Sequence, residues 1–145
     1  MKEQRKRLND HGFSLVELIV VIAIIGVLVG AATPQVIKYI ERSRVAADLN
    51  SADVIDSAIE MAITDEDAYK DLMSKFDGKN SITFDIEKNG FNFGSSELKE
   101  TDPFIKEVKS ILGELPKAKA KDRTEFKITI TSKDDGNFSL NVRAN

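Results

Sequence analysis

One ionisable residue, Glu17, lies inside an otherwise apolar run that extends from Phe13 to Ala32. At 1.5 Å rise per residue, a helix of about 20 residues spans roughly 30 Å, the hydrocarbon thickness of a bilayer. The carboxyl group of Glu17 is therefore expected inside a membrane, close to its edge. Ionisable groups are costly there and usually have a function, so Glu17 is the first candidate for chemistry or recognition.

Residue types that support catalysis or bind metals are scarce in the rest of the chain. There is no cysteine, which excludes disulfides and thiolate sites, and the single histidine, His11, cannot form a multi-histidine site. The acidic clusters at 65–67 and 134–135 lack the ligand spacing of an EF-hand, and no glycine-rich phosphate loop is found. We therefore expect no enzymatic activity, no cofactor and no metal site.

Two further motifs have simpler interpretations than a binding site. The basic run KAKAKDR at 117–123 is interpreted as a solvated, flexible connection before a strand, and less readily as a DNA contact. The triplet at 137–139 matches a glycosylation acceptor, but its place in a predicted hairpin favours a chance match. The chain has 21 Lys and Arg against 24 Asp and Glu, so nucleic acid is not expected as a partner.

The N-terminal residues have the charge pattern of a targeting signal. Residues 1–12 carry four basic and two acidic side chains and lead directly into the apolar run. A basic leader stays in the cytoplasm, which places the residues after Thr33 outside. An ordinary secretory signal cut near 29–31 and a plain signal anchor are the alternatives, and neither accounts for Glu17.

The residues around Gly12 carry a specific resemblance. The sequence GFSLVEL at 12–18, behind a basic leader and ahead of an apolar run, resembles the class III signal of type IV prepilins. The resemblance implies that the prepilin peptidase, which is also a methyltransferase, cuts between Gly12 and Phe13 and N-methylates Phe13. It also implies that Glu17 is the carboxylate found at the fifth position of the mature family members.

Such processing would create a pair of opposite charges. Cleavage leaves a free amine on Phe13, one helical turn from Glu17, and opposite charges within about 4–6 Å stabilise each other. In a helix bundle, the amine of an incoming subunit would pair with Glu17 of its neighbour and fix the axial register, as a lone polar residue does in a coiled coil. Before cleavage, the charged leader would hold the helix in the membrane.

Three residues later in the run are candidates for helix packing or bending. Gly26 and Gly30 form a G-x-x-x-G that lets helices approach closely, although glycine is also common in transmembrane helices without such a role. Pro34 cannot donate a backbone hydrogen bond and is expected to bend the helix. We divide the chain into a leader at 1–12, a transmembrane and polymerisation helix at 13–34, and a head domain at 35–145 that includes the rest of the long helix.

Beyond Pro34 the helix is expected to continue with one apolar face packed on a sheet. A short second helix is predicted at 68–76, and a third begins at Asp102-Pro103, with Asp as the cap, and stops at Pro116. The expected apolar face of the long helix consists of Val45, Leu49, Ala52, Ile55, Ile59 and Ala62, with Asp48, Asn50, Asp53, Asp56 and Glu60 on the rest of its circumference. The expected face of the third helix consists of Phe104, Val108, Ile111, Leu112 and Leu115.

Alternating apolar residues predict four strands. Residues 82–86 and 91–93 flank a turn at Asn89-Gly90, and 126–130 and 138–142 form the clearest hairpin. The resulting fold class is α+β, with a four-stranded antiparallel sheet packed on the long helix, which agrees with the architecture of pilins.

The resemblance implies a structural function. The leading hypothesis is the main subunit of a type IV pilus, a helical homopolymer whose partners are the prepilin peptidase and the pilus assembly platform. The alternatives are a minor pilin or a pseudopilin of a type II secretion or DNA-uptake system, and a membrane-anchored binding domain that does not polymerise. The precursor is expected in the cytoplasmic membrane with its N-terminus inside, and the mature chain in a fibre on the cell surface.

Overall fold

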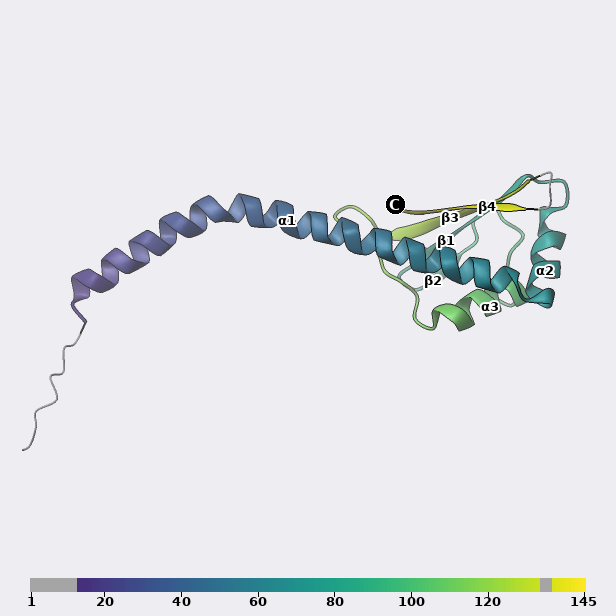
Figure 1. The fold of residues 1–145 in the computed structure, drawn as a ribbon, viewed down its shortest axis with the longest axis horizontal. Helices are drawn as coiled ribbons and strands as arrows, with labels where there is room; N and C mark the ends of the chain where they lie inside the picture. Colours follow the sequence, from purple (N-terminus) through teal and green to yellow (C-terminus); the bar gives the residue numbers. More distant parts are fainter. Residues whose placement is uncertain (1–12, 134–136) are drawn as a thin grey trace, which may run out of the picture. The chain divides into compact units, whose positions relative to one another are not determined.

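A computed structural model describes residues 13–133 and 137–145 (Figure 1). The predicted leader at 1–12, with His11 and Gly12, and residues 134–136 of the last hairpin lie outside the described residues. The helices are α1 (Leu15–Ile63), α2 (Glu66–Phe76) and α3 (Pro103–Leu112), and the strands are β1 (Ser81–Glu87), β2 (Gly90–Asn92), β3 (Glu125–Ser132) and β4 (Phe138–Ala144). The predicted α+β class is confirmed.

The chain divides between Tyr39 and Ile40 into two compact units, and α1 contributes to both. In the first unit every described residue from Phe13 to Tyr39 is exposed. This part of α1 is long and apolar enough to cross a membrane, and none of its most apolar window is buried. The second unit contains the sheet, α2, α3 and the remainder of α1.

The sheet of the second unit has the strand order β2-β1-β3-β4, and all neighbouring pairs are antiparallel. The register pairs Phe84 of β1 with Ile128 of β3, and Ile128 with Val142 of β4. Because side chains alternate along a strand, these three residues share one face of the sheet, and that face belongs to the core. The four-stranded antiparallel sheet predicted from the sequence is confirmed.

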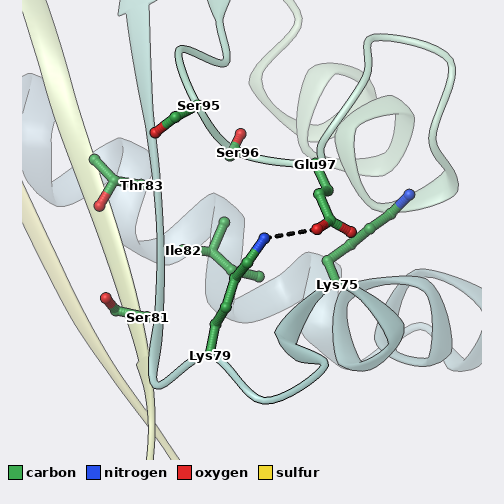
Figure 2. Close-up of a pocket in the computed structure, with 8 residues that line it drawn as sticks. All are labelled: Lys75, Lys79, Ser81, Ile82, Thr83, Ser95, Ser96 and Glu97. Atoms are coloured by element: carbon green, nitrogen blue, oxygen red, sulfur yellow. Dashed lines mark hydrogen bonds and ion pairs between the residues drawn. The ribbon is translucent and has the colours of Figure 1, made fainter.

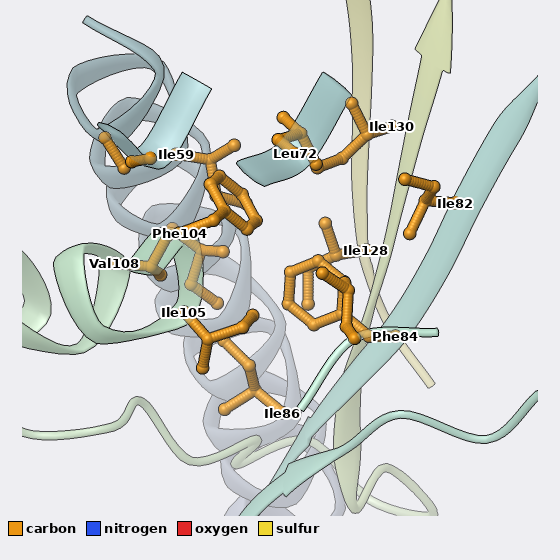
Figure 3. Packing of buried hydrophobic residues seen from close by; sticks show 14 of the residues in the cluster. Ile59, Leu72, Ile82, Phe84, Ile86, Phe104, Ile105, Val108, Ile128 and Ile130 are labelled. Atoms are coloured by element: carbon orange, nitrogen blue, oxygen red, sulfur yellow. The ribbon is translucent and has the colours of Figure 1, made fainter. Parts of the chain in front are cut away.

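Helices and sheet bury one apolar core (Figure 3). Ile55 and Ile59 of α1 are fully buried, and Phe104 of α3 meets Phe84 of β1 edge-on with ring centroids 6.5 Å apart. Such an edge-to-face pair contributes about 0.5–1.5 kcal/mol beyond the area that it buries. The core therefore joins α1 and α3 to the same face of the sheet.

Two predictions about the apolar face of α1 are wrong. Leu49 was expected in the core but is 60% exposed, and Asp48 was expected on the polar side but is 1% exposed. Successive residues of a helix are rotated by about 100°, so Asp48 falls among the buried residues Ala52, Ile55 and Ile59, and Leu49 falls outside them. A polar residue at the centre of a buried face requires partners, and Asp48 has them.

The end of α3 also differs from the prediction. The helix stops at Leu112, before Pro116, because Gly113 adopts a positive φ of 65° and its N–H bonds to the carbonyl of Lys109. Glycine reaches this backbone conformation without steric cost, which is why it ends many helices. Ile111, Leu112 and Leu115 are half-buried at the edge of the core.

The starts of α2 and α3 show two uses of aspartate. Asp65 caps α2 by accepting from the N–H groups of Asp67 and Ala68, so this helix begins at Glu66 and not at 68. Asp102 occupies the predicted cap position of α3, but its side chain makes no cap hydrogen bond. The N–H of Phe104 instead donates to the carboxylate of Asp71 in α2, at 3.4 Å.

The β-hairpins lie close to their predicted positions. The turn between β1 and β2 is at 88–89, one residue earlier than expected, and β2 ends at Asn92, so Phe93 lies outside it. The hairpin of β3 and β4 is confirmed, and the N–H of Lys133 donates to the carbonyl of Asn137 across its loop.

Candidate functional site

Glu17 lies in the first turn of α1, where it caps its own helix. The Ser14 N–H donates to Oε2 of Glu17 at 2.8 Å, and the Ser14 hydroxyl accepts from the Val16 N–H at 3.4 Å. A serine followed three residues later by a glutamate is a capping box, in which each side chain satisfies a free backbone donor at the start of the helix. This role was not predicted, although the S-x-x-E spacing at 14–17 is visible in the sequence.

The capping role changes how Glu17 can act in assembly. One oxygen of its carboxylate accepts the Ser14 N–H, and an ionised carboxylate has acceptor sites to spare on both oxygens. Phe13, the residue that would carry the new amine, is 91% exposed beside this site. Glu17 can therefore cap its own helix and still receive an amine from another chain.

The apolar side chains that follow Glu17 have no partners within the described part of the chain. Val27, for example, is 74% exposed. Gly26 and Gly30 lie one turn apart in α1, and no atom outside their own stretch of helix lies within 4 Å of the position that a Cβ would occupy. A surface of this kind suits lipid or other apolar helices. Whether the two glycines pack against a neighbour stays a prediction.

Pro34 lies inside α1, and the helix continues through it. In a regular helix, residue 34 would donate its N–H to the carbonyl of Gly30, and proline has no such donor. The Thr33 hydroxyl donates to the Val29 carbonyl at 2.6 Å in the same turn. The helix therefore lacks one regular backbone hydrogen bond at this point and has a side-chain hydrogen bond next to it, which is where a bend was predicted.

Two carboxylates of α1 hold the connection between α3 and β3. The Lys119 N–H donates to Oδ1 of Asp48 at 2.7 Å, and the Ala120 N–H donates to Oδ2 at 3.0 Å. Two turns earlier, Glu41 accepts the N–H of Lys121 at 2.7 Å. The prediction of a free, solvated connection at 117–123 is therefore wrong for its backbone.

The charge of the buried Asp48 is balanced at its edge. Nη1 of Arg123 lies 3.8 Å from Oδ2 of Asp48. The two backbone donors and this guanidinium together replace the water that a carboxylate loses on burial. No sequence pattern identifies Asp48 as buried, because its hydrogen-bond partners are backbone groups more than 70 residues away.

A second charged cluster joins α2 to the start of α3. Nζ of Lys75 lies 3.1 Å from Asp102 and 3.8 Å from Asp71, and all three side chains are less than one-fifth exposed. The hydrogen bond to Asp102 raises the pKa of Lys75 above its ordinary value of 10.5, against the opposing effect of burial, and the charges of Asp102 and Asp71 raise it further. This cluster is a structural link between the helices.

A polar pocket of about 290 Å³ lies next to this cluster, beside β1 (Figure 2). The Lys79 ammonium bonds to Glu97 at 2.7 Å, and this hydrogen bond and the positive charge lower the pKa of Glu97. Hydroxyl groups from Ser81, Thr83, Ser95 and Ser96 line the remainder. No imidazole or thiol accompanies these hydroxyls in the described ranges, and no group of acidic or imidazole side chains there has the arrangement of a metal site.

Comparisons with known proteins agree with the properties of α1. Residues 7–33 match the family model of the prokaryotic N-terminal methylation motif. The type IV major fimbrial protein FimA of Dichelobacter nodosus is 42% identical over 62 residues, which are 43% of this chain and 40% of that protein. The chain thus spans less than half the length of this relative.

Two other relatives extend the comparison. A fimbrial protein of Pseudomonas aeruginosa is 28% identical over 133 residues, which are 92% of this chain and 86% of that protein. The type IV major pilin protein PilA of Myxococcus xanthus is 31% identical over 75 residues, 52% of this chain and 34% of that protein. No solved structure gives a significant match.

The chain thus combines an exposed apolar helix, which starts within a methylation motif and is long enough to cross a membrane, with an α+β head, and this arrangement is pilin-like. Together with the methylation motif, the fimbrial relatives support a type IV pilin family for this chain.

Proposed function

We propose that the chain is the structural subunit of a type IV pilus and that it polymerises through the N-terminal part of α1. The observation that carries the proposal is the exposed apolar surface of the N-terminal part of α1, which begins at the capping carboxylate of Glu17 within the methylation motif. The relatives named as major fimbrial or pilin proteins support a structural and non-enzymatic role.

Processing would precede assembly. The prepilin peptidase cuts between Gly12 and Phe13 and methylates the new amine of Phe13. The subunit waits in the cytoplasmic membrane with its head outside, and the assembly platform then adds it to a surface fibre. The apolar surface of α1 supports both states, because it suits lipid before assembly and neighbouring helices afterwards.

Glu17 would select the position of each incoming subunit. Its carboxylate already caps α1, so it is oriented toward the helix start, where the amine of a neighbouring Phe13 would arrive. An ion pair in an apolar surrounding adds little net stability, but a mismatched register would leave a buried charge unpaired at a cost of several kcal/mol. The pair therefore acts mainly on register.

The test compares three variants of the full-length chain. Glu17→Ala removes both the cap and the charge, Glu17→Gln keeps a capping acceptor but removes the charge, and Ser14→Ala removes the other half of the capping box but keeps the charge. Membrane-bound mature subunit and sheared fibre are measured together. Pairing predicts that both Glu17 variants lose fibre and that Ser14→Ala keeps it.

Two other results would contradict the proposal. Normal fibre from Glu17→Gln together with loss in Ser14→Ala would show that capping, not charge pairing, is what assembly needs. Mass spectrometry of the mature wild-type chain should give methylated Phe13 at the N-terminus, and a chain that begins at Ala32 would exclude the prepilin route. A minor pilin or pseudopilin would show the same cleavage without being the main component of the fibre.

A further inference from the structure

The two edges of the sheet differ in how they are protected. β2 forms one edge with only three residues, whereas β4 (yellow in Figure 1) forms the other with seven. Natural sheets protect their edges with short strands, bulges, proline or charged residues, because an open edge can pair with another strand. β4 is paired with β3 along its whole length without a bulge, and it contains no proline and a single charge, Arg143. The long edge is therefore open to pairing.

Backbone groups of β4 point out from this edge. Asn145 and Glu125 of β3 exchange two hydrogen bonds, at 2.9 and 3.2 Å. Such pairs recur at every second residue of an antiparallel ladder, so the odd-numbered residues of β4 are bonded to β3. The even-numbered residues, among them Leu140 and Val142, direct their N–H and C=O groups away from β3. In the described part of the chain no other strand pairs with β4 on that side.

The side chains of β4 form an apolar and a polar row beside the open backbone. Leu140 and Val142 are half-buried at the edge of the core, so part of their apolar surface is exposed. On the other face of the sheet Ser139, Asn141 and Arg143 are exposed. No ion pair or hydrogen bond within 13–133 and 137–145 involves these three polar side chains. A strand docked at this edge would extend both rows and the backbone ladder.

We propose that the open edge of β4 pairs with β4 of a second copy, antiparallel and with Asn141 of both copies at the two-fold axis. Leu140 of each copy then lies opposite Val142 of the other, and their outward N–H and C=O groups bond to each other. The two sheets join into one sheet with both apolar faces on the same side. The contact uses only residues of the second unit and goes beyond the proposed polymerisation through α1.

The residues of β4 suit a copy of themselves in this register, which pairs the strand over its whole length. The residue on the axis stands opposite its own copy, and here it is Asn141, whose amide both donates and accepts hydrogen bonds. Arg143 lies opposite Ser139 of the other copy, and the serine hydroxyl can accept from the guanidinium. A register centred on Arg143 would instead place two like charges opposite each other, which destabilises a sheet.

The β4 contact is different in kind from the contacts that build a fibre. Its two-fold axis is perpendicular to the joined sheet, so every strand of one copy runs opposite to the same strand of the other. Each copy uses its single β4 edge on one partner, and the contact is therefore closed. A fibre grows through heterologous contacts that repeat from copy to copy. The β4 contact thus joins heads in pairs, including heads of different fibres.

Disulfide cross-linking of the full-length chain in detergent tests the register, because the chain has no cysteine. Asn141→Cys should give a disulfide-linked dimer, because non-hydrogen-bonded partners in an antiparallel ladder have Cα atoms about 4.5 Å apart, within the range of a disulfide. Ser139→Cys alone should stay monomeric, since residue 139 and its own copy lie about 13 Å apart along the strands. Arg143→Cys alone should do the same, and a mixture of these two variants should form the mixed dimer.

Charge substitutions measure the strength of the pairing, which sedimentation of the full-length chain in detergent follows. Asn141→Lys should weaken association by about tenfold or more, because it places two lysines opposite each other at the axis. Ser139→Glu should strengthen association severalfold, because the new carboxylate faces Arg143 of the other copy. Ser81→Lys is the matched control for Asn141→Lys and should leave association unchanged, since it adds the same charge to the same face of the sheet, at an exposed residue of β1.

Three results would overturn the β4 contact. They are a wild-type chain that stays monomeric at every concentration, an Asn141→Lys variant that associates as well as Ser81→Lys, and equal self-cross-linking by all three single cysteines. The last result would indicate a parallel pair, in which every residue stands opposite its own copy. None of these results bears on leader cleavage or fibre yield, so each would leave the pilus proposal standing. The expected cross-links in a chain that never forms fibre would support the β4 contact and contradict the pilus function.

Discussion

Replacing Asp48 with alanine should release the connection between α3 and β3 from α1. The carboxylate is buried and accepts the N–H groups of Lys119 at 2.7 Å and Ala120 at 3.0 Å. Both donors would lose a charged acceptor, and Arg123 would lose its neighbour at 3.8 Å. Alanine leaves a space that can admit water, and water would accept from the two N–H groups without the negative charge of the carboxylate.

The magnitude follows from these contacts. A hydrogen bond to a charged group contributes about 1.5–3 kcal/mol, and because the connection can relax toward solvent we take the lower value for each of the two, about 3 kcal/mol in total. For a domain of roughly 100 residues, 1 kcal/mol shifts the melting temperature by about 4 °C or more, so a decrease of about 12 °C is expected.

The assay is thermal unfolding of the purified full-length chain in detergent, followed by circular dichroism, together with amide hydrogen exchange at 119–121. Glu41→Ala is the matched control, because it removes one hydrogen bond from a more exposed carboxylate of the same helix and should cost less than about 1 kcal/mol. Equal melting temperatures for wild type and Asp48→Ala, with unchanged exchange at Ala120, would refute the reasoning.

Three further predictions follow from the described contacts. Asp56→Asn should stabilise the head at pH 7 by about 0.5 kcal/mol, because it removes a carboxylate that partial burial and then the charges of Glu60 and Asp53 disfavour. Since the folded pKa of Asp56 is raised above 3.8, the gain should be absent well below that pH and grow as the pH rises through the raised value, which acid titration of both proteins measures. Lys75→Met should destabilise the head by about 1–2 kcal/mol at neutral pH because Asp71 and Asp102 lose their cation. The pKa of Lys75 in the folded chain is raised above 10.5, so its contribution to the free energy of unfolding is complete below that pH. Denaturant titrations should show the difference in stability between wild type and Lys75→Met shrinking as the pH rises beyond 10.5 and through the raised value. Residues 35–145, expressed alone, should be soluble and unfold cooperatively, because the core draws on no residue before Ala52, and a broad, non-cooperative melt would contradict this.

The regular spacing of apolar residues in the sequence predicted most of the buried faces of the strands and helices. The strand alternation at 82–86 and the three- and four-residue steps from Ala52 to Ala62 correctly identified the buried faces, because both patterns arise from the geometry of the strand and the helix. The S-x-x-E spacing of the capping box at Ser14 and Glu17 was also visible in the sequence, but only the charge of Glu17 was interpreted, and its role as a cap was not predicted.

The parts that failed depend on contacts distant in the sequence. A search for apolar periodicity assigns Asp48 to the polar side of the helix because it is charged. Its burial depends on backbone donors some 70 residues later in the chain, which the periodicity does not include. Asp102 was predicted to cap α3, but Lys75 of α2 attracts its carboxylate and Asp71 accepts the Phe104 N–H. The local rule predicts which residue type stands at a helix start, but tertiary neighbours determine which hydrogen-bond donors its side chain accepts.

The way α1 holds the connection at 119–121 has a consequence for sequence variation. Glu41 and Asp48 accept hydrogen bonds from backbone N–H groups, which every amino acid except proline possesses. The attachment therefore does not depend on the identity of the exposed side chains of Lys119 and Lys121. Proline is excluded at all three positions because it has no N–H, and Ala120 must stay small because it is buried. The outer residues of this connection are therefore free to diversify, and short peptides grafted there would be displayed from a backbone that the helix itself anchors.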